Sequence, residues 1–63
     1  MYRYFVYTTI FIKGTIYQHL DIYKCKDKVN EDIFRAESLF KYLDKISKCD
    51  DYTIAIIRQF KER

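Results

Sequence analysis

The sequence predicts an α+β fold, a two-layer ββαβ sandwich in which one helix covers one face of a three-stranded antiparallel sheet. Three observations lead to this prediction: two runs of aromatic and β-branched residues flank the only glycine, an amphipathic segment follows them, and an Ile-rich run comes last. The 63 residues are enough for a single domain, 1–63, whose small core is marginal without added support.

The first two strands should form a hairpin. Tyr2 to Ile12 (YRYFVYTTIFI) is rich in residues that pack well on a pleated sheet. Lys13-Gly14 follows, and a glycine at the second position of a two-residue loop supplies the positive φ that a type I′ turn requires. Thr15 to Lys24 then returns as the second strand, so that Ile12 opposes Thr15.

The segment after the charged connector, Lys24 to Lys28, should be a helix. Asn30 is a preferred N-cap, and the acidic residues that follow it suit the positive end of the helix dipole. Val29 and Phe34 have the spacing of a hydrophobic staple. Phe34 lies off the apolar stripe of the helix, which at about 100° per residue consists of Ile33, Ala36, Leu39, Phe40, Leu43 and Ile46.

The third strand is predicted at Tyr52 to Phe60 (YTIAIIRQF), after a turn at 49–51, and the chain ends in a frayed polar segment, 61–63. A right-handed crossover through the helix leaves the first strand in the middle of the sheet, between the second and the third. The third strand is then an edge. Its segment Thr53 to Ile57 carries neither charge nor Pro, a composition that favours strand addition.

Both faces of the predicted sheet are apolar, and one helix can cover only one of them. One face carries Phe5, Tyr7, Phe11, Ile16, Leu20 and Ile22, and the other carries Tyr4, Val6, Ile10, Ile12, Tyr17 and Tyr23. The sequence leaves open which face the helix covers. A contiguous apolar patch on a small protein usually marks a binding surface. We expect contact with a partner through Tyr4, Val6, Ile10, Ile12, Tyr17, His19, Tyr23, Ile54 and Ile56.

No motif for catalysis, for a cofactor or for a metal occurs, so we predict no such residues and no enzyme. His19, the only histidine, has no carboxylate, Ser or Cys arranged with it as a catalytic group, and Asp21 merely shares its face of the strand. Asp50-Asp51 offers too few oxygens for calcium. Cys25 and Cys49 lack the spacing of a zinc site. A helix of about eighteen residues, about 27 Å long, should separate them, so we expect two free thiols.

The charge balance is mildly basic, with a net charge of +3 and a pI of about 8.9, and it does not demand a nucleic-acid partner. Binding of RNA or single-stranded DNA remains an alternative. Its bases would stack on Tyr4, Tyr17 and Tyr23, and its phosphates would contact Lys13, Lys24 and Lys26. Neither a signal peptide nor an apolar run of about 18 residues is present, so we expect a cytosolic protein without a membrane partner.

The chain combines a Tyr-rich first strand (YRYFVY), a hairpin, one helix with Lys-rich turns at its end, and a final Ile-rich strand (YTIAII). In this combination it resembles the small accessory proteins of bacteriophages and mobile elements, among them anti-CRISPR and other anti-defence inhibitors. The resemblance implies a stoichiometric inhibitor that binds a host protein, such as a CRISPR or other defence effector, in the host cytoplasm. We therefore expect a non-enzymatic protein-binding module that also forms a homo-oligomer.

Overall fold

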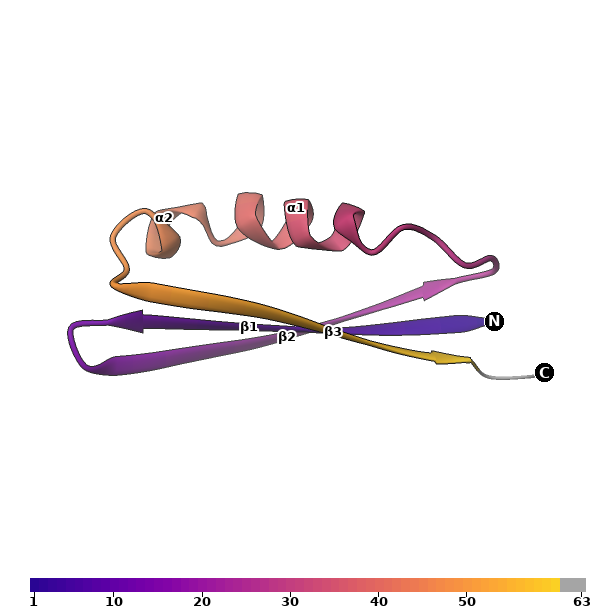
Figure 1. The fold of residues 1–63 in the computed structure, drawn as a ribbon, viewed down its shortest axis with the longest axis horizontal. Helices are drawn as coiled ribbons and strands as arrows, with labels where there is room; N and C mark the ends of the chain where they lie inside the picture. The colour runs from indigo at the N-terminus through magenta and orange to yellow at the C-terminus, as the bar shows by residue number, and fades with distance from the viewer. Residues whose placement is uncertain (61–63) are drawn as a thin grey trace.

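A computed structural model describes residues 1–60 and confirms the predicted α+β fold. Three antiparallel strands form one open sheet in the order β2-β1-β3, and both helices lie on the same face of it (Figure 1). The elements are β1 (Tyr2–Ile12), β2 (Thr15–Cys25), α1 (Asp32–Lys41), α2 (Leu43–Ile46) and β3 (Asp51–Phe60). The frayed end predicted at 61–63 lies outside the described residues. The molecule is a slab of 44 × 17 × 12 Å.

The hairpin has the predicted register. Ile12 pairs with Thr15, and the two loop residues both have positive φ, 46° at Lys13 and 82° at Gly14, as a type I′ turn requires. The start of β3 is tied to this turn: the backbone N–H of Lys13 donates to a carboxylate oxygen of Asp50 at 2.9 Å, and the N–H of Asp50 donates to the carbonyl of Phe11 at 2.8 Å. Asp50 therefore joins the hairpin to the third strand.

The helix begins near the predicted residue but is shorter than expected. Asn30 Oδ1 accepts the backbone N–H of Asp32 at 2.9 Å, so Asn30 satisfies a free donor of the first turn, while Glu31, which directly precedes α1, makes no side-chain cap. At Tyr42 the backbone leaves helical values, with φ −109° and ψ 28°. The single long helix that we expected is thus split into α1 and the one-turn helix α2.

α1 turns a different side to the sheet than its apolar stripe predicts. Phe34 is 6% exposed and Ser38 is fully buried against the sheet, whereas Phe40 is 82% exposed. The rings of Tyr4 and Tyr23 explain this rotation, because they lie 4.8 and 4.6 Å from the Phe34 ring, centroid to centroid. Aromatic packing on Phe34 therefore decides which side of the helix is buried.

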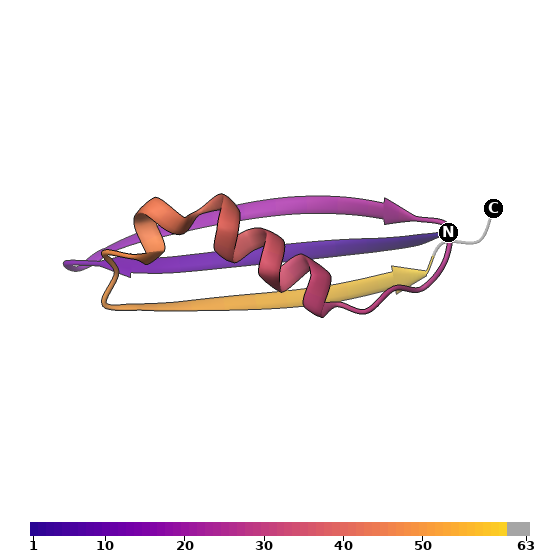
Figure 2. The ribbon, with the colours of Figure 1, turned by 90° about the horizontal axis from the view of Figure 1, so that it is seen from above.

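The helices cover the face that we had expected to be free for a partner. Tyr4, Val6 and Ile10 are fully buried and form the core together with Phe34, so this expectation was wrong. In the strand register, one face holds all nine residues predicted to contact a partner, namely Tyr4, Val6, Ile10, Ile12, Tyr17, His19, Tyr23, Ile54 and Ile56. Seen from above, α1 crosses this face diagonally, from β3 toward β2 (Figure 2).

Cys25 ends β2 and Cys49 precedes β3, and both thiols are free, as predicted. Within residues 1–60, neither α1 nor α2 has the length and apolar character needed to cross a membrane.

Candidate interaction surfaces

The sheet face opposite the helices is mostly apolar and is crossed by one polar row, Thr9, Gln18 and Thr53. We call it the open face: Phe5, Tyr7 and Phe11 of β1, Ile16, Leu20 and Ile22 of β2, and Ala55 and Ile57 of β3. All of these except the half-buried Phe5 and Phe11 are exposed to solvent. The charged side chains that share this face lie at its ends, with Arg3 and Lys24 at one end and Asp51 at the other. The middle of the open face is therefore uncharged.

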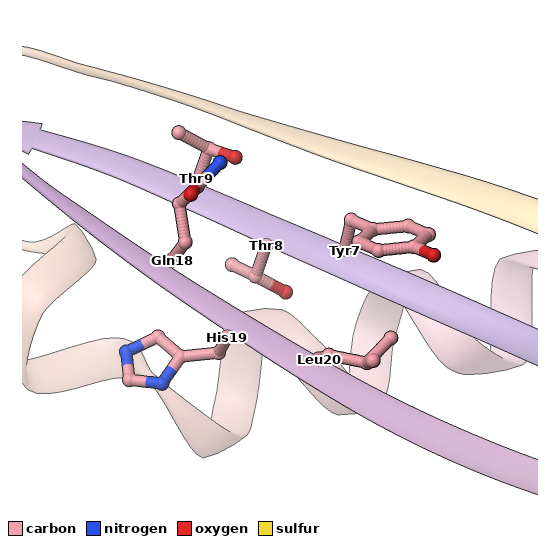
Figure 3. Close-up of a pocket in the computed structure, with 6 residues that line it drawn as sticks. All are labelled: Tyr7, Thr8, Thr9, Gln18, His19 and Leu20. Carbon is pink, nitrogen blue, oxygen red and sulfur yellow. The ribbon is translucent and has the colours of Figure 1, made fainter.

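A pocket of about 280 Å³ lies between two cross-strand pairs of β1 and β2. Tyr7 pairs with Leu20 along one side of it, and Thr9 pairs with Gln18 along the other (Figure 3). Thr8 and His19 also contribute to its lining. These pairs belong to the open-face side of the register, so a side chain from another molecule could enter the pocket there.

The second apolar surface is the side of the helices that the sheet leaves uncovered. We call it the helix ridge: Ile33, Ala36 and Phe40 of α1 and Leu43 of α2, all exposed. Exposed Asp32, Glu37 and Asp44 accompany these residues on the two helices and form no ion pair within residues 1–60.

The cations of α1 are engaged elsewhere. Lys41 binds Asp21, and Arg35 binds the carbonyl of Ile54. The helix ridge is therefore an apolar surface whose free flanking charges are acidic.

A polar cluster anchors the C-terminal end of α1 to β2. Asp21 accepts hydrogen bonds from Lys41 Nζ at 2.6 Å and from the Tyr42 hydroxyl at 2.7 Å. The ring of His19 stacks on that of Tyr42, with centroids 4.2 Å apart. Tyr42 lies at the point where the helix breaks, and from there it contacts both Asp21 and His19. The break in the helix and the polar cluster therefore share this residue.

The protonation of this cluster follows from its contacts. Burial raises the pKa of Asp21, but the hydrogen bonds from Lys41 and Tyr42 outweigh this effect and hold the pKa below its ordinary value. Burial, followed by the hydrogen bond to Asp21, raises the pKa of Tyr42. The hydrogen bond to Asp21 also raises the pKa of Lys41. The cluster is thus a charged Asp–Lys pair with a neutral tyrosine.

Two hydroxyl groups are buried between the layers without a hydrogen-bond partner among residues 1–60, Thr8 Oγ1 and Ser38 Oγ. Both residues are fully buried. His19 Nε2 and Arg3 Nε are also buried without a hydrogen-bond partner among these residues. An unsatisfied buried hydroxyl lowers stability, because it gives up its hydrogen bonds to water and gains none in return.

We therefore expect Thr8→Val to raise the free energy of unfolding by about 1 kcal/mol, since valine keeps the shape of threonine and removes the hydroxyl. Urea titration at a fixed protein concentration measures this change. The matched control is Thr15→Val, at an exposed position at the start of β2, which should change stability by less than about 0.5 kcal/mol. A loss of stability in Thr8→Val would mean that its hydroxyl has a partner, such as a bound water.

β3 is an edge strand, as predicted. Part of this edge is occupied by the chain itself: Arg35 Nη1 donates to the carbonyl of Ile54 at 2.7 Å, and Asp51 Oδ1 accepts the N–H of Tyr52 at 2.8 Å. A strand added over Thr53 to Ile57 would compete with Arg35 for the Ile54 carbonyl. This contact makes strand addition less favourable than the bare sequence suggests.

The residues considered for nucleic acid do not form one exposed platform. Tyr4 is fully buried, and the ring of Tyr23 is stacked on Phe34. Tyr17 is partly exposed, and Lys45 lies over its ring, 5.5 Å from the centroid. The Asp21 cluster was not among the predicted sites, because its strand and helix residues come together only in the fold. In the part of the chain that is described, no three His, Cys, Asp or Glu side chains gather as a metal site would require.

Comparisons with protein-family models, with curated proteins and with solved structures found no significant match.

Proposed function

We propose that the chain is a non-enzymatic protein-binding module that acts in the cytoplasm of a bacterial host and inhibits a defence protein by stoichiometric binding. The binding half of this proposal is supported by the helix ridge, where a large aromatic side chain, Phe40, stands 82% exposed on a helix fixed to the sheet. The inhibitor half rests on the resemblance of the whole chain to phage accessory proteins.

The helix ridge favours one kind of partner. Ile33, Ala36 and Phe40 follow the i, i+3, i+7 spacing by which an amphipathic helix enters an apolar groove. The free charges beside them, Glu37 and Asp44, are acidic. Electrostatic complementarity therefore selects a protein groove with an apolar floor and a rim of Lys or Arg.

The rotation of α1 also supports the proposal that the helix ridge binds another protein. A helix of a small domain usually buries its apolar stripe against the core. In α1 the buried side chains are instead Phe34 and Ser38. The apolar side chains of the ridge thus do not contribute to the core of the monomer. Their burial against a second protein would yield about 25 cal/mol for each Å² of apolar surface removed from water.

The test is capture of proteins from a bacterial lysate by tagged wild-type protein, compared with two variants. Phe40→Asp should abolish capture of the specific protein, and Lys26→Gln, which changes net charge equally at an exposed site in the connector, should retain it. The captured protein, once purified, should bind with one-to-one stoichiometry, lose affinity as salt rises, and lose activity on binding. Equal binding of Phe40→Asp would exclude the helix ridge. Retention of oligonucleotides instead of a protein would favour the nucleic-acid alternative.

A further inference from the structure

The folded chain buries little apolar surface of its own. Among residues 1–60, the fully or nearly fully buried hydrophobic side chains are Tyr4, Val6, Ile10 and Phe34. Domains of this size are marginal, and those without disulfides or metals are commonly stabilised by self-association. Both thiols are free, so no disulfide provides this support. The open face is the sheet face that the helices leave uncovered, and an association could cover it.

The area of the open face suits a dimer. Nine residues of strand extend about 30 Å, and three strands are about 14 Å wide, which gives a flat footprint of about 400 Å² for each copy. The accessible surface of protruding side chains exceeds the flat footprint. Two such faces together therefore bury roughly 1,000 Å², the lower limit for a specific interface. The expected dimer is one of modest affinity.

The charges at the two ends of the open face complement each other when a second copy is inverted. Arg3 and Lys24 are paired across β1 and β2 at one end, and Asp51, paired with Phe11, lies at the other. Inversion brings the cationic end of each copy over the acidic end of the other, which forms the same contact twice, as a twofold axis requires. A copy in the same orientation would place four cations together.

We infer that the open face binds a second copy of this chain, packed face to face and inverted, with Arg3 and Lys24 of each copy facing Asp51 of the other. Tyr7 lies midway along β1 between positions 3 and 11, so the two Tyr7 rings meet near the axis, beside the pockets that Thr9 and Gln18 border. Both helix ridges remain outside this dimer. The inferred dimer therefore uses a different surface from the proposed function. The dimer can be disproved while the proposed function still holds.

Sedimentation equilibrium between about 1 and 100 µM tests the dimer. Wild-type protein should be dimeric at the upper end of this range, and Tyr7→Lys should be monomeric, because two charges would meet at the axis. Phe40→Ala, on the helix ridge, is the control and should leave the dimer unchanged. Circular dichroism establishes that each variant is folded. A wild-type monomer over the whole range, or an unchanged Tyr7→Lys dimer, would overturn the inference.

A charge exchange tests the inverted orientation. Arg3→Glu and Asp51→Lys should each weaken the dimer at least about tenfold, because each creates two like-charge contacts. An equimolar mixture of the two variants should regain most of the lost affinity, since Glu at position 3 then faces Lys at position 51 and Arg3 faces Asp51, and only one like-charge contact, between Lys24 and Lys at position 51, is left. Failure of the mixture to regain affinity would overturn the inverted arrangement. If Tyr7→Lys is unfolded, this pair of variants decides the question alone.

Discussion

Replacing Phe34 by Ala is expected to lower the free energy of unfolding by about 3–5 kcal/mol, the usual cost of removing a buried phenylalanine ring. The ring packs on both Tyr4 and Tyr23, and few other apolar side chains are buried. A domain of this length has a total stability of only about 3–9 kcal/mol, so much of the Phe34→Ala protein should be unfolded at room temperature. Urea titration followed by circular dichroism measures the loss.

Phe40→Ala is the matched control, since the same side chain is removed six residues further along the chain. Its ring is 82% exposed, so the expected change is within about 0.5 kcal/mol. The apolar stripe of the sequence predicts the opposite order, with Phe40 buried and Phe34 outside the stripe. Equal losses in the two variants, or a larger loss in Phe40→Ala, would show that α1 is rotated toward its apolar stripe.

Asp21→Asn should lower the free energy of unfolding by about 1–3 kcal/mol at pH 7, because it removes the charge that accepts hydrogen bonds from Lys41 and Tyr42. The pKa of Asp21 is lowered in the folded protein, so its contribution is complete above its unfolded pKa of about 4 and is lost as the pH falls through the folded pKa. The difference between wild type and variant should therefore shrink in acid.

Urea titrations at a series of pH values check this dependence, and Asp27→Asn, at an exposed site in the connector, serves as the control. A deficit that stays constant down to the acid limit would mean that the charge of Asp21 is not what stabilises the cluster. At alkaline pH the dependence runs the other way, because stability is lost as the pH rises. The pKa of Tyr42 is raised in the folded protein, so its contribution is present below pH 10 or so and is lost as the pH rises through the folded value.

The sequence determines the sheet well because its information there is local. A single glycine fixes the hairpin loop, and the period of two along each strand then sorts every residue onto a face. Which face the helix covers was not decidable in this way, since both faces are apolar. The predicted partner contacts lie on the face that holds Tyr4 and Ile10, and the structure buries both residues.

The orientation of α1 depends on contacts between distant parts of the chain. A stripe of apolar residues takes no account of what lies beneath the helix, and here Tyr4, Tyr23 and Asp21 offer specific partners to Phe34 and Tyr42. One sign was present in the predicted register: Asp21 shares a face with the tyrosines, and a carboxylate beneath a helix requires hydrogen-bond donors. Tyr42, about two helical turns after Phe34, supplies one of these donors, and Lys41 supplies another.

The central position of β1 also sets the order in which the molecule can be completed. Of the three strands, β1 is synthesised before β2 and β3. It pairs with β2 as soon as the hairpin closes, but its other edge stays unpaired until β3 emerges. Tyr7 of β1 pairs with Ala55 of β3, which lies roughly fifty residues later in the chain. Because ribosomes add about 5–20 residues per second, one edge of β1 stays unpaired for several seconds during synthesis. Contacts between such distant segments also slow folding. The nascent chain is therefore most exposed to aggregation just before β3 emerges.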